Sequence, residues 1–123
     1  MPTRDRRLLV AALLLFALWL ASIGPVRTWA SHVGLRGHWA VGVAPSFLAG
    51  FTFVLWQAFA TRSRPLVCAA YAVALVVLTE LAQLVLPGYT ADVWDVVAGA
   101  VGAGLAVPVL LRLTRQAIGF SSR

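Results

Sequence analysis

The chain has 123 residues, of which 61% are hydrophobic and only 11% are charged. A soluble domain of this size has too little interior to hide that much apolar surface, so the composition excludes an ordinary soluble protein and indicates an integral membrane protein. The formal net charge of +6 comes from arginine, with no lysine anywhere. In such an apolar chain the charge predicts membrane topology, and we expect no nucleic-acid partner.

The first apolar span, residues 8–23, follows a basic cluster and ends at Gly24-Pro25. Proline cannot continue the helical hydrogen-bond ladder, so we expect the helix to stop there. The charged start and the leucine-rich body also resemble a signal peptide, but Pro25 stands where a cleavage site would be followed by an ordinary residue. We therefore interpret the span as a retained transmembrane helix.

The segment 26–43 is polar enough to leave the hydrocarbon and aromatic enough to stay at its boundary. Its polar and aromatic residues are Arg27, Trp29, His32, Arg36, His38 and Trp39. We expect an outer loop or a short interfacial helix. The histidines lack a metal-ligand spacing and the single cysteine, Cys68, has no partner for an intramolecular disulfide, so we expect no metal and no cofactor.

Three further apolar spans follow, at residues 44–60, 65–86 and 93–111, and Pro45 is well placed in the first turn of its helix. The last two are close to the roughly 20 residues that cross a bilayer core of about 30 Å. The chain has no repeat, low-complexity tract or linker. We therefore expect one domain over residues 1–123, an all-α polytopic membrane bundle of four transmembrane helices.

The arginines are spread unevenly over the segments that connect these spans. If the amino terminus is cytoplasmic, only two of the ten lie outside, namely Arg27 and Arg36. The other eight are Arg4, Arg6, Arg7, Arg62, Arg64, Arg112, Arg115 and Arg123. The positive-inside rule therefore predicts that both termini are cytoplasmic.

The buried polar residues are concentrated in the second half of the chain. Glu80 and Gln83 interrupt an apolar helix and share one of its faces, and an ionisable group in a membrane helix usually has a partner or a function. Asp92 and Asp95 share a face at the start of the next helix. At 1.5 Å per residue, Glu80 lies roughly 9 Å below the expected outer boundary, in a layer similar to that of Asp95. These four residues form our candidate binding site.

Structural roles are the alternative for the same residues. Asp92 is well placed to cap the last helix, and Asp95, at the third helical position, complements the helix dipole. For Glu80 the alternative is a hydrogen bond that stabilises the bundle, or an ion pair with Arg27 or Arg36 of the outer segment.

The last helix carries a face of small residues below Asp95, formed by Gly99, Gly102 and Ala106. Small residues let membrane helices approach closely. We expect this face to pack against the preceding helix, because only a tight turn separates the two in the chain.

At these residues the sequence resembles the VanZ-like family of small bacterial membrane proteins, named for a member associated with teicoplanin resistance. The likeness rests on Glu80-x-x-Gln83, on Leu86-Pro87-Gly88, on Asp95 followed by Gly102, and more loosely on Ala44-Pro45-Ser46-Phe47-Leu48. Three residues depart from the family pattern: Tyr89, Gly99 and Ala49 stand where arginine, asparagine and histidine are often found. The resemblance implies a multi-pass protein of the bacterial inner (plasma) membrane.

Together these features favour a non-enzymatic cell-envelope protein whose acidic site binds a lipid-linked or glycopeptide-like ligand or a membrane-protein partner. One alternative is a membrane enzyme acting on lipid headgroups with Glu80 as general base, although no nucleophile, metal motif or phosphate-binding cluster accompanies it. Another is a structural subunit that docks into a larger membrane complex through its small-residue face. In each case membrane lipid surrounds the protein.

Overall fold

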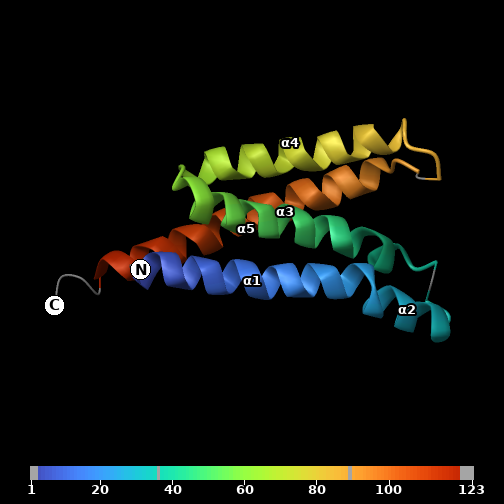
Figure 1. Ribbon diagram of the computed structural model, residues 1–123, viewed down its shortest axis with the longest axis horizontal. Coiled ribbons are helices and arrows are strands. Elements are labelled where there is room, and N and C mark those ends of the chain that lie inside the picture. The colour runs from blue at the N-terminus through green and yellow to red at the C-terminus, as the bar shows by residue number, and fades with distance from the viewer. Residues whose placement is uncertain (1–2, 36, 89, 120–123) are drawn as a thin grey trace.

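The computed structural model describes residues 3–35, 37–88 and 90–119, and its long helices lie side by side (Figure 1). In chain order the helices are α1 (Thr3–Ile23), α2 (Pro25–His32), α3 (Trp39–Thr61), α4 (Pro65–Gln83) and α5 (Val93–Gly119). Four segments are long and apolar enough to cross a membrane, with α1 and α2 counted together. The expected all-α bundle of four potential transmembrane helices is therefore confirmed.

Prolines mark several of the helix boundaries. α1 ends just before Gly24 and α2 begins at Pro25, as expected for a residue that cannot donate to the helical ladder. α4 likewise begins at Pro65. Pro45, in contrast, lies inside α3, which already begins at Trp39, so our expected start of this helix is wrong. The apolar residues before Pro45 extend the helix back to the end of the polar segment.

The last two helices also differ from their expected lengths. α4 ends at Gln83 and not at Leu86, although the Leu86 N–H still donates to the Ala82 carbonyl at 3.1 Å. α5 continues past Leu111, its expected end, to Gly119. Arginine is a good helix former, so this extension can leave the apolar layer without unwinding.

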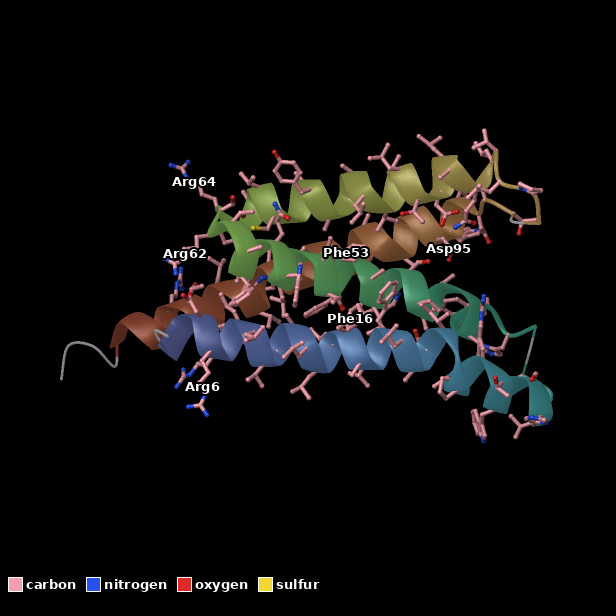
Figure 2. All side chains as sticks on the ribbon, viewed as in Figure 1. Arg6, Phe16, Phe53, Arg62, Arg64 and Asp95 are labelled. Atoms are coloured by element: carbon pink, nitrogen blue, oxygen red, sulfur yellow. The ribbon has the colours of Figure 1, made fainter. Side chains whose placement is uncertain are left out.

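The two ends of the bundle have different charges. The start of α1, the end of α5 and the α3–α4 connection lie at one end, where Figure 2 shows Arg6, Arg62 and Arg64. There Arg62 Nη2 lies 2.7 Å from Asp5 Oδ2, which ties the first turn of α1 to the end of α3. The opposite end holds α2, the start of α3 and the α4–α5 connection, with Asp95 nearby (Figure 2).

The core lies between α3 and α5, with α1 along one side and α4 along the other (Figure 1). All four long helices contribute buried residues to one cluster: Leu8, Ala12, Val54, Leu55, Ala58, Cys68, Ala72, Ala103, Ala106 and Leu110. Many large apolar side chains face outward instead, including Leu14 of α1 and Leu78 of α4. An outer surface of this kind suits lipid and would be unfavourable in water.

Glycines bring the backbones of α3 and α5 into direct contact. A Cβ atom on Gly102 would lie 3.0 Å from the carbonyl carbon of Phe47 and 3.2 Å from the backbone nitrogen of Phe51. A Cβ atom on Gly50 would lie 3.0 Å from the Cα atom of Gly99 and closer still to its carbonyl group. Neither position leaves room for a side chain.

The small-residue face of α5 therefore packs most closely on α3, and our expectation that it packs on the preceding helix α4 is wrong in this respect. α4 meets the face at Gly99, where a Cβ atom would lie 2.7 Å from a methyl group of Val76. Ala106 is fully buried in the shared core. Neighbours in the chain are thus not the closest neighbours in space.

The glycine contact gives a direct test of the packing. We expect Gly102→Leu to lower the folded yield and the thermal midpoint, because the new side chain must displace the α3 backbone, and overpacking typically costs about 1–3 kcal/mol. The matched control is Gly104→Leu, the same change on the same helix at a position with nothing within 4 Å of an added Cβ atom. Thermal unfolding and size-exclusion chromatography in detergent would measure both. Equal stability of the two variants would contradict the packing.

Candidate functional site

Glu80 joins the end of α4 to the start of α5. Its side chain is buried, with 7% of the residue exposed. Glu80 Oε2 accepts a hydrogen bond from the Asp92 backbone N–H at 3.1 Å, and Oε1 accepts one from Gln83 Nε2 at 3.2 Å. Hydrogen bonds to a charged acceptor are among the stronger ones in proteins. The two bonds therefore account for an acidic residue in an apolar helix and hold the α4–α5 connection in place.

Asp92 caps α5, as its position in the sequence predicts. Asp92 Oδ1 accepts a hydrogen bond from the Trp94 N–H at 2.9 Å, and the Asp92 carbonyl accepts one from the Asp95 N–H at 3.0 Å. These bonds satisfy backbone donors at the helix start that have no partner within the helix. The structural interpretation of Asp92 is thus confirmed.

Asp95 differs from the other two acids of the site. It lies in the first turn of α5 and is half-buried. Among the residues that the structure describes, its carboxylate has no hydrogen-bond or ion-pair partner. Its charge is favourable at a helix amino terminus, but both oxygens can still accept hydrogen bonds from a ligand.

The four predicted site residues line one groove at the end of the bundle away from the arginine cluster. Hydrogen bonds connect Glu80, Gln83 and Asp92, whereas Asp95 stands apart from them. The alternative ion pair between Glu80 and Arg27 is not formed. Arg36, the other proposed partner, is outside the described residues.

The groove has a volume of about 1470 Å³ and is open to the surroundings. This exceeds the roughly 300–1,000 Å³ of common small-molecule pockets. The end of α4 and the start of α5 form its acidic wall, and the first half of α3 runs along it. The side chains between the walls are mainly apolar and include Phe47, Leu48, Val97 and Val101. An apolar surface with charged groups at its edge can hold an amphiphilic molecule.

Several groove residues were not predicted as site residues. Arg27 of α2 lines it, as do His38 and Trp39 at the start of α3 and Trp19 of α1. The sequence showed that the segment 26–43 suits a membrane boundary, but nothing in the local pattern placed it beside the acids of α4 and α5. Arg27 also lines a smaller hollow of about 500 Å³ between α2 and α3.

The geometry bears on the chemistry that Glu80 can perform. A general base must be able to reach a proton of the substrate. Glu80 is only 7% exposed and each of its oxygens accepts a hydrogen bond from the protein, so the residue is arranged to position the α4–α5 connection. Within the described part of the chain, no three His, Cys, Asp or Glu side chains are grouped to hold a metal ion.

In comparisons with known proteins, no family model, no curated protein and no solved structure matches this chain. Functional inference therefore depends on the residues and the geometry of the groove.

The bond between Glu80 and the Asp92 amide can be tested by hydrogen exchange. We expect Glu80→Leu to speed exchange of the Asp92 amide about tenfold or more, because a charge-assisted hydrogen bond contributes roughly 1.5–3 kcal/mol. Thr79→Leu is the control, since the Thr79 hydroxyl donates to the Leu75 carbonyl of its own helix at 2.8 Å and takes no part in the bond to Asp92. Unchanged protection at Asp92 in Glu80→Leu would show that the bond does not hold the connection.

Proposed function

We propose that this chain is a VanZ-like integral membrane protein of the bacterial cell envelope, whose groove binds a lipid-linked or glycopeptide-like ligand at the outer leaflet. The observation that carries the proposal is the groove itself, which combines an apolar lining with Asp95 on one wall and Arg27 on the other. Binding sites of this composition use apolar area for affinity and a few polar groups for orientation.

The charge distribution supports an outward-facing groove. Arg6, Arg62 and Arg64 lie at the end of the bundle where α1 begins and α5 ends, and the positive-inside rule favours a cytoplasmic position for that end. Trp39 and Trp94 line the groove and are 74% and 65% exposed, respectively. Tryptophan is enriched at the membrane–water boundary, which fits a groove at the depth of the lipid headgroups.

Two alternatives have less support from the structure. An enzyme with Glu80 as general base needs an accessible oxygen on that residue, but Glu80 is only 7% exposed. A structural subunit that docks through the small-residue face needs that face to be free, but Gly99 and Gly102 are buried against α3 and α4 within the same chain. Ligand binding in the groove avoids both conflicts.

Cysteine labelling tests the proposed orientation. In a Cys68→Ala background, we expect a membrane-impermeant maleimide to label Ser31→Cys in intact cells and Arg64→Cys only after permeabilisation. Both residues are exposed, and they lie at opposite ends of the bundle. Labelling of Arg64→Cys in intact cells would reverse the orientation and place the groove on the cytoplasmic side.

Filling the groove tests the binding function. We expect expression of the natural chain to change the sensitivity of a bacterial host to teicoplanin, and Val101→Trp to abolish that change by occupying the groove. Val101 is 50% exposed and lines the groove, so the larger side chain does not enter the core. Leu105→Trp is the matched control on the same helix, at a residue that is 52% exposed.

Protein levels would be compared by immunoblot. Equal effects of the two variants at equal protein level would argue against the groove as the binding site. No effect of the natural chain on teicoplanin sensitivity would remove the glycopeptide from the proposal.

A further inference from the structure

The groove carries unpaired charges of both signs. Asp95 lines it from α5 and Arg27 lines it from α2. Neither side chain has a hydrogen-bond or ion-pair partner among the described residues. Glu80, in contrast, is buried, and both of its oxygens accept hydrogen bonds that hold the α4–α5 connection. Asp92 is exposed, and one of its oxygens accepts the capping bond of α5.

Asp95 favours a cationic group in the ligand. A carboxylate that is partly removed from water is stabilised by a cation that donates hydrogen bonds to it. The next residue toward the amino terminus, Trp94, also lines the groove, and an aromatic face attracts an ammonium group. A purely anionic ligand would instead bring like charge to this wall.

Arg27 favours an anionic group in the same ligand. Its guanidinium presents several donors in a planar arrangement that matches phosphate oxygens. The residue is exposed and reaches the groove from the short helix α2. A purely cationic ligand would leave it unmatched.

The apolar part of the groove favours a ligand with acyl chains. Val97 and Val101 line the groove and are 44% and 50% exposed, respectively. The apolar lining therefore continues onto the outer surface of the bundle, which suits lipid. Phe47 and Leu48 extend this apolar lining along α3. A lipid can therefore place its headgroup between the charged walls while its chains stay in the bilayer.

We infer that the groove binds a zwitterionic phospholipid, with its ammonium group at Asp95 and its phosphate at Arg27. This inference rests on the proposed ligand-binding function of the groove and names the class of ligand. Phosphatidylethanolamine has the required groups, because its ammonium donates hydrogen bonds and its phosphate is anionic. Phosphatidylglycerol has the same phosphate and acyl chains but no ammonium group, and it is therefore the matched comparison.

Native mass spectrometry tests the inference. The full chain in detergent is mixed with equal amounts of the two lipids, and the lipid that stays bound after release from the detergent is measured. We expect phosphatidylethanolamine to be retained about fivefold more than phosphatidylglycerol, which corresponds to roughly 1 kcal/mol. Asp95→Asn should abolish this preference, Asp95→Glu should restore it, and Arg27→Gln should weaken retention of both lipids. Arg64→Gln, at the opposite end of the bundle, should change nothing.

The outcomes separate this inference from the broader proposal. Preference for phosphatidylglycerol, or a preference for phosphatidylethanolamine that survives in Asp95→Asn, would overturn the assignment of a zwitterionic ligand. If Val101→Trp still lowered lipid retention in that case, while Leu105→Trp did not, the groove would remain a binding site for another ligand. Lipid retention that is unchanged in Val101→Trp would overturn both the zwitterionic ligand and the proposed binding function of the groove.

Discussion

The close approach of α3 and α5 is the contact on which the rest of this structure depends. In lipid, helices gain little from burying apolar side chains against each other, so association relies on tight backbone packing. Gly50, Gly99 and Gly102 provide that packing here, because a side chain at any of them would collide with a neighbouring helix. The contact also sets α5 alongside the first half of α3. As a result, the start of α5, from Asp95 to Ala98, runs beside the start of α3, and the groove lies between them.

The acidic residues at this end show how the chain accommodates charge in an apolar setting. Both carboxylate oxygens of Glu80 and Oδ1 of Asp92 accept hydrogen bonds from donors of their own hairpin. The bonds to the buried Glu80 offset the cost of removing its carboxylate from water, and they hold the α4–α5 connection without an arginine partner among the described residues. Asp95, one turn further along α5, has no partner for its carboxylate among the described residues. The acids of this cluster therefore differ in role, because Glu80 is committed to the fold whereas Asp95 remains able to accept hydrogen bonds.

The sequence predicted the features that depend on local chemistry. Composition identified the four apolar segments, Pro25 and Pro65 marked helix boundaries, and the position of Asp92 predicted its cap. Features that depend on which helices meet were not predicted, because spacing shows that Gly102 lies on a small-residue face but not which helix covers it. The same limit applies to Arg27, whose place on the groove follows from the path of the chain between α1 and α3.

The position of Arg27 runs against the charge pattern of the rest of the molecule. Arg6, Arg62 and Arg64 lie at the end where α1 begins and α5 ends, and Arg62 there pairs with the buried Asp5 at 2.7 Å. Arg27 lies at the other end and lines the groove that Asp95 also lines, yet the two side chains form no ion pair. Opposite charges that line one groove without pairing are the arrangement on which our inference of a zwitterionic ligand rests. Such a ligand would also account for a cation at the end of the bundle opposite Arg62 and Arg64, where the proposed orientation disfavours it.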